Sequence, residues 1–212
     1  LAIVRPVNLV VLSLVPFFLV SNLDLPTFSI KNGLKPFLAI IPVFLSIVSL
    51  QLLAYHWQTG EWIVWAYKGE GFNWDSPEII KTLFSYKRGL FVYAPVCLLS
   101  LLGIYHLWKL SSVKSMTLVT CLTIVIYVVS SWHAWGYGWA YGLRAYVEFL
   151  PLFAIPLAAM LSMAKPKLKW GIVSVAVLFC VYTQIQTYQV TEQILPLAGI
   201  EKQEFWEIFL RF

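Results

Sequence analysis

The sequence predicts an all-α membrane protein with about six transmembrane helices and short interfacial helices in a loop and in the tail. Hydrophobic residues make up 60% of the 212 residues and charged residues 12%, whereas soluble domains average roughly 45–50% and about 25%. The mean hydropathy is +0.77. A chain with so little polar surface cannot cover a soluble core of this size, and lipid is the better solvent for it.

The apolar residues gather in six runs, each close to the length of about 20 residues that crosses a bilayer as a helix. Helices are expected because lipid offers the backbone no hydrogen-bond partners. We treat residues 1–212 as a single transmembrane domain. Because an apolar run begins almost at once and Leu1 is not Met, we expect a fragment that lacks N-terminal membrane helices of the same protein. The runs are 3–20, 37–57, 89–108, 116–132, 147–163 and 170–190.

The lysines predict the orientation. The connections 21–36, 109–115 and 164–169 hold seven lysines against one acid, Asp24. Short basic loops stay in the cytoplasm. The long outer loop 56–88, the segment 131–148 and the tail 191–212 then share the opposite, outer face.

The outer loop contains a helix signal at residues 76–87. Ser76-Pro77-Glu78 has the form of an N-cap, a first-turn proline and a first-turn acid. Gly89 follows as a helix stop. Four apolar residues recur at helical spacing and predict the buried or membrane-facing side: Ile79, Ile80, Leu83 and Phe84.

The tail repeats this pattern. Phe205, Ile208, Phe209 and Phe212 fall on one helical face, with charged residues elsewhere. We expect a second amphipathic helix there, lying at the membrane interface.

Segment 131–148 is the main candidate for a binding site. It holds three Trp, three Tyr and three Gly around Arg144. A membrane-interface belt also concentrates Trp and Tyr, but it does not need glycines, which allow tight turns and close approach of backbone to a ligand. Arg144 lies four residues before Glu148 and either pairs with it or faces a functional cavity.

Other classes of function are disfavoured. The net charge of +5 comes from lysines at helix ends, not from a basic patch on a solvated domain, so nucleic-acid binding is not expected. Cys97, Cys121 and Cys180 lie in apolar runs without C-x-x-C spacing. No histidine spacing predicts a zinc site.

Several motifs resemble, in order, the C-terminal half of bacterial polytopic glycosyltransferases of the GT-C type. These are relatives of the dolichyl-phosphate-mannose protein mannosyltransferases and of the lipid A aminoarabinose transferases. The resemblance spans nearly the whole chain, although each motif alone is weak. The matching segments are Arg5-Pro6-Val7-Asn8, residues 83–96 (LFSYKRGLFVYAPV), residues 136–144 (GYGWAYGLR) and residues 204–210 (EFWEIFL).

The resemblance implies a transferase that takes a sugar from a polyprenyl-phosphate donor at the outer face of the bacterial cytoplasmic membrane. The family's catalytic Asp lies in the first outer loop of the full protein. That loop is not part of these 212 residues, so the catalytic residue is expected outside the chain.

Within this frame the chemistry assigns roles to residues of the outer face. Arg144 and Arg88 are candidates to bind the donor phosphate, because the planar guanidinium fork matches phosphate oxygens, although either could be a helix-end side chain reaching the headgroups. Trp139, Tyr141 and His133 are candidates to contact the sugar or acceptor. Two acids are candidates to orient an acceptor hydroxyl or hold a divalent cation, or are solvated turn residues: Glu70 and Asp75.

Two other classes of function stay open. One is a transporter or flippase-like bundle for a lipid or another amphiphile, which would show inverted repeats and broken helices. The other is a membrane assembly subunit without catalysis.

Overall fold

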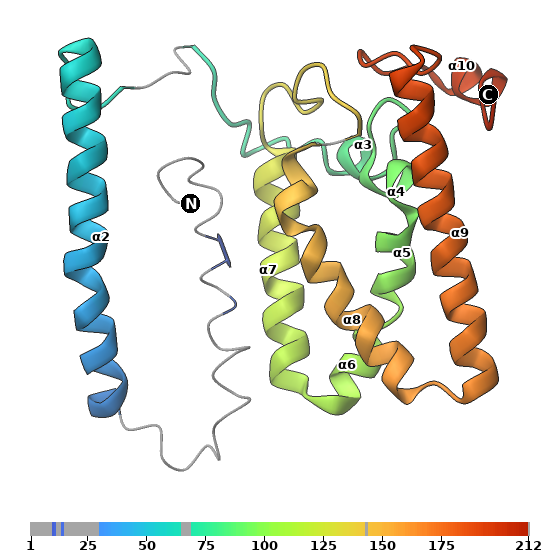
Figure 1. Ribbon diagram of the computed structural model, residues 1–212, viewed down its shortest axis with the longest axis horizontal. Coiled ribbons are helices and arrows are strands. Elements are labelled where there is room, and N and C mark those ends of the chain that lie inside the picture. The colour runs from blue at the N-terminus through green and yellow to red at the C-terminus, as the bar shows by residue number, and fades with distance from the viewer. Residues whose placement is uncertain (1–9, 12–13, 15–29, 65–68, 143, 212) are drawn as a thin grey trace. The chain divides into compact units, whose positions relative to one another are not determined.

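A computed structural model describes residues 10–11, 14, 30–64, 69–142 and 144–211, without the side chains of residues 30–40 (Figure 1). The chain divides into two compact units, residues 1–71 and 72–212. The first predicted span, 3–20, lies largely outside the described residues, and so does Phe212.

The described residues are helical apart from turns and an isolated bridge between Phe72 and Trp132, which confirms the all-α class. Unit 1 contributes α2 (Ile30–Thr59). The elements of unit 2 are α3 (Ile79–Phe84), α4 (Leu90–Tyr93), α5 (Pro95–Leu101), α6 (Ile104–Leu110), α7 (Ser112–Ser130), the 3₁₀ helix η3 (Arg144–Phe149), α8 (Leu150–Met163), α9 (Pro166–Thr191) and α10 (Lys202–Glu207).

Four helices in the described part of the chain are long and apolar enough to cross a membrane. They cover Ile41–Thr59, Ser112–Ser130, Arg144–Met163 and Pro166–Thr191. They support a membrane protein, but they do not confirm the expected count of about six. The difference arises from the run 3–20, which is not described, and from the run 89–108, which is not one helix.

The run 89–108 is divided into α4, α5 and α6, with breaks at Ala94 and at Gly103. Pro95 opens α5, and the residue before a proline avoids the helical region. Ala94 accordingly has φ −135° and ψ 67°. At the second break, a Cβ on Gly103 would overlap the backbone carbonyl of Pro156 in α8. Glycine therefore permits the close approach of α6 and α8.

Unit 2 is a helical bundle with loops at one end. The short helices α5 and α6 pack on α8, while α6 also contacts α7 and α5 contacts α9. Figure 1 shows the segment around α3, the loop that follows α7, and α10 gathered at one end, and the turns α6–α7 and α8–α9 at the other. We call the first end the cap and define it as residues 72–89, 131–142 and 192–211.

The short helix of the outer loop differs from its prediction. It begins at Ile79, with Glu78 as N-cap, and ends at Phe84, where Ser85 turns to extended backbone. Gly89 has φ −58° and is not a left-handed helix stop. Ile80 is 71% exposed, whereas Thr82 is fully buried. The inward side of α3 is thus anchored by the Thr82 hydroxyl, and Ile80 on its other side is exposed.

The tail contains the expected short helix, α10. A reciprocal capping box between Glu201 and Glu204 fixes its first turn. Phe205 is buried in a cluster with Tyr93, Leu195 and Ile200. The apolar side of the tail therefore packs on protein at this point and does not lie free at the interface.

Candidate functional site

An open depression of about 430 Å³ lies in the cap. Three segments that are distant in sequence form it: the end of the outer loop, the loop after α7 and the tail. The side chains around it are basic or aromatic. They include Lys87, Arg88, His133, Trp135, Tyr137 and Trp139, with Ala198 at the tail edge.

Arg88 holds these three segments together. Its side chain is only 4% exposed. One terminal nitrogen, Nη1, donates a hydrogen bond to the carbonyl of Gly136, and the other, Nη2, donates to the carbonyl of Leu197 at 2.5 Å. A planar guanidinium can serve two carbonyls at once. Arg88 therefore fixes the shape of the depression as well as giving it positive charge.

The electrostatics of Arg88 favour an anion nearby. Burial lowers the pKa of Arg88; the nearby Tyr93 opposes this shift, and the like charge of neighbouring Arg144 adds to it. Arginine stays charged at neutral pH even so. The Nε atom of Arg88 is buried without a hydrogen-bond partner among the described residues. A cation buried in this way is stabilised by negative charge brought to the depression.

Glycines shape the loop around Arg88. Gly138 and Gly142 have φ of +74° and +56°, values that side chains rarely tolerate. A Cβ on Gly136 would lie 3.2 Å from the Arg88 guanidinium. Gly138 and Gly142 thus serve the tight turning that was predicted for these glycines, and Gly136 leaves room for the Arg88 side chain.

Trp139 and His133 present exposed rings at the depression. Trp139 is 78% exposed, so its indole is open to lipid or to a ligand. His133 is exposed, and its ring lies against that of Trp132, 4.9 Å between centroids. Together they give a ligand flat surfaces on which to stack.

Tyr141 lies elsewhere and has a structural role. Its hydroxyl lies within hydrogen-bond distance of the Thr183 carbonyl and of the Gln186 side chain in α9, at 3.3 and 3.1 Å. Its ring packs edge-on against that of Tyr93. Burial raises the pKa of Tyr141. The residue ties the loop to α9 and does not line the depression.

The remaining candidates are dispersed. Arg144 is exposed at the start of η3, near Arg88 but not lining the depression. Asp75 is exposed in the turn before α3, and Glu70 is exposed in unit 1. The described residues bring no three His, Cys, Asp or Glu side chains together as a metal cage. A divalent cation therefore remains a prediction from sequence.

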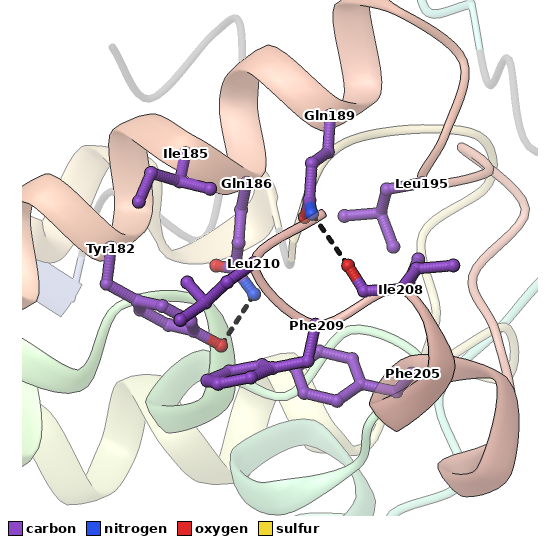
Figure 2. A pocket seen from close by; sticks show the side chains of 9 residues that line it. All are labelled: Tyr182, Ile185, Gln186, Gln189, Leu195, Phe205, Ile208, Phe209 and Leu210. Atoms are coloured by element: carbon purple, nitrogen blue, oxygen red, sulfur yellow. Dashed lines mark hydrogen bonds between the residues drawn. The ribbon is translucent and has the colours of Figure 1, made fainter. Parts of the chain in front are cut away.

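A second, enclosed space lies between α9 and the tail and is too small for a ligand. Its volume of about 10 Å³ is close to the minimum for one water molecule. Figure 2 shows Gln189 reaching the carbonyl of Ile208 and Gln186 reaching the hydroxyl of Tyr182, at 2.8 and 2.7 Å. Gln189 also donates to the Arg211 carbonyl. This space is a small gap in the packing of the tail against α9, where hydrogen bonds from Gln189 hold the tail.

Neither Lys87, which lines the depression, nor the glutamines Gln186 and Gln189, of which Gln189 fastens the tail, was among the residues predicted from sequence. A signal for the glutamines was present. Gln186 and Gln189 lie one turn apart in an apolar run, and polar residues inside such runs are uncommon unless they have partners. The contribution of the tail to the depression has no local signal, because it arises only from tertiary folding.

Fold and composition together define the class: a helical membrane protein with a basic, aromatic depression at one end of its bundle. No protein-family model, curated protein or solved structure matches the chain. Assignment beyond this class rests on the site and on the motifs of the sequence.

Proposed function

We propose that the chain is the C-terminal membrane portion of a glycosyltransferase that uses a polyprenyl-phosphate sugar donor. The observation that carries the proposal is the depression in the cap, which combines two cations, Lys87 and Arg88, with exposed rings of Trp139 and His133. A donor of this kind has an apolar tail, an anionic phosphate and a sugar. The apolar tail can lie in lipid. The phosphate can bind a guanidinium or ammonium group, and the sugar can stack on an aromatic ring.

The depression also lies at a suitable depth for such a donor. It is at one end of helices long enough to span a bilayer, where the phosphate of a lipid-embedded molecule is found. The polyprenyl chain would follow the apolar sides of the bundle, and the phosphate and sugar would enter the cap. The lysine pattern of the sequence assigns this end to the outside, so the proposal puts the reaction at the outer face of the bacterial cytoplasmic membrane.

The structure changes the roles proposed for the two arginines. Both terminal nitrogens of Arg88 already hold backbone carbonyls, so Arg88 shapes the depression and contributes charge. Arg144 is exposed beside it and can turn its guanidinium fork to a phosphate. We assign the direct phosphate contact to Arg144 and stacking on the sugar to Trp139. The catalytic acid or base is expected outside the chain.

One observation favours a second candidate, a lipid transporter or flippase. The helix expected at 89–108 is interrupted at Ala94 and at Gly103, and interrupted helices are common in transporters. However, the carbonyl of Tyr93, released by the first break, accepts a hydrogen bond from the Thr183 hydroxyl. The break thus serves to join α4 to α9, and the transferase is the better-supported proposal.

Transfer and flipping are separated by one pair of assays on vesicles carrying the complete gene product. A radiolabelled polyprenyl-phosphate sugar reports transfer to an acceptor, and a fluorescent analogue with dithionite quenching reports movement between leaflets. The transferase proposal expects label in a new product without accelerated flipping. Accelerated flipping with no transferred label would replace it with the transporter.

A further inference from the structure

The end of unit 2 opposite the cap is strongly basic. Figure 1 shows the turns α6–α7 and α8–α9 side by side at this end. Five lysines lie at or next to these two turns. We call them the lysine end: Lys109, Lys114, Lys165, Lys167 and Lys169.

Within unit 2, the two turns at this end contain no acidic residue. Every Asp and Glu of residues 72–212 lies in the cap or at the cap-side end of η3 and α9. These residues are Asp75, Glu78, Glu148, Glu192, Glu201, Glu204 and Glu207. The exposed lysines of this end, Lys109, Lys165, Lys167 and Lys169, therefore lie in a part of unit 2 whose two turns contain no acidic residue.

Exposed tryptophans accompany the lysines at this end. Trp170 and Trp108 are 70% and 51% exposed there, and exposed tryptophan concentrates where acyl chains meet headgroups. The ammonium of Lys109 lies 4.4 Å from the centre of the Tyr105 ring. Lys165, Lys167 and Lys169 are exposed. Ammonium groups and indole rings thus occupy one layer.

We propose that the lysine end binds the headgroups of anionic phospholipids. Charge complementarity selects the sign of the partner, and the exposed tryptophans select a lipid over a soluble acidic protein. A lysine near an anionic bilayer strengthens its association by about fivefold. Several lysines in one layer make the leaflet on this side preferentially anionic around the bundle, independently of any chemistry in the cap.

The test uses the complete gene product in phosphatidylcholine vesicles that contain brominated lipid. Bromine quenches tryptophan fluorescence at short range, so quenching reports which lipid lies beside the protein. Brominated phosphatidylglycerol is compared with brominated phosphatidylcholine. Subtraction of the signal of a Trp170→Phe variant isolates the fluorescence of Trp170 at the lysine end.

We expect the Trp170 signal to report an affinity for phosphatidylglycerol about tenfold above that for phosphatidylcholine. The double variant Lys167→Gln/Lys169→Gln should reduce this preference to about twofold or less. A matched pair at the cap, Lys81→Gln/Lys202→Gln, should leave it unchanged. High salt should weaken the preference of the unmodified protein, because headgroup charges are screened.

Three outcomes would overturn the proposal. The first is equal quenching of Trp170 by the two brominated lipids in the unmodified protein. The second is a preference for phosphatidylglycerol that persists in Lys167→Gln/Lys169→Gln. The third is a loss of this preference in Lys81→Gln/Lys202→Gln as large as in Lys167→Gln/Lys169→Gln. Absence of quenching by either lipid would place the lysine end outside the membrane surface and would also overturn it. Each of these outcomes leaves the proposed transferase untouched, because the depression lies at the other end of unit 2.

Discussion

The guanidinium of Arg88 donates a hydrogen bond to the carbonyl of Gly136, a residue 48 positions further along the chain. Its second terminal nitrogen reaches the carbonyl of Leu197, 109 positions away. One side chain thereby joins the outer loop, the loop after α7 and the tail. The shape of the depression therefore depends on these two hydrogen bonds of Arg88, which hold three separate segments in place.

Arg88→Lys should loosen the depression without removing its charge. A single ammonium cannot reproduce two donors in a fixed fork, and loss of one charge-assisted hydrogen bond costs about 1.5–3 kcal/mol. Amide hydrogen exchange in residues 133–139 should therefore accelerate by about tenfold or more. Arg144→Lys is the control and should leave exchange there unchanged, because Arg144 is exposed. Unchanged amide exchange in Arg88→Lys would show that residues 133–139 keep their conformation without the two hydrogen bonds from Arg88.

Gly103→Ala should destabilise unit 2. The added Cβ would overlap the Pro156 carbonyl, and forcing atoms into a packed contact costs about 1–3 kcal/mol. Gly171→Ala is the control, since a Cβ there meets no atom within 4 Å. Within α9 this change should be neutral or stabilising by up to about 1 kcal/mol. Thermal unfolding in detergent checks the pair, and equal melting temperatures would disprove the close approach of α6 to α8.

The hydroxyls of Thr82 and Ser130, 2.6 Å apart and buried, should show energetic coupling. Thr82→Val and Ser130→Ala each leave the partner hydroxyl with one contact fewer. A double-mutant cycle on the free energy of unfolding should therefore give a coupling of about 0.5–1.5 kcal/mol. Additive effects would mean that α3 docks on α7 without this bond. Ile80→Ser, on the exposed side of α3, should not couple to Ser130→Ala.

Alkaline pH should weaken the cap through Tyr141. Burial raises the pKa of Tyr141 above the ordinary value of 10.0, so the folded state holds its proton longer than the unfolded state does. The contribution of this neutral hydroxyl to the free energy of unfolding is complete below pH 10. It is lost progressively as the pH rises above that value. Tyr141→Phe should reduce the alkaline slope of the unfolding free energy. An identical slope in both proteins would contradict the burial of this hydroxyl.

The sequence predicted the long helices well, because an apolar run of 20 residues has few alternatives in lipid. It predicted one membrane-spanning helix at 89–108, whereas Pro95 interrupts this run locally and the contact of Gly103 with Pro156 depends on α8 lying opposite. Around the candidate site, Trp139, His133 and Arg88 line one depression, whereas Arg144, a candidate for the donor phosphate, does not line it. Tyr141 does not line the depression, because its hydroxyl lies within hydrogen-bond distance of Thr183 and Gln186 in α9. Such pairings between distant segments leave no local pattern in the chain.

Saturation binding of a radiolabelled polyprenyl-phosphate sugar to the complete gene product tests the central claim most directly. Trp139→Ala should weaken binding about tenfold, because one stacked aromatic contact contributes about 1.4 kcal/mol. Trp170→Ala removes an equally large and exposed indole at the opposite end of the bundle and should leave binding unchanged. Equal affinities of the unmodified protein and Trp139→Ala would contradict a donor site in the cap.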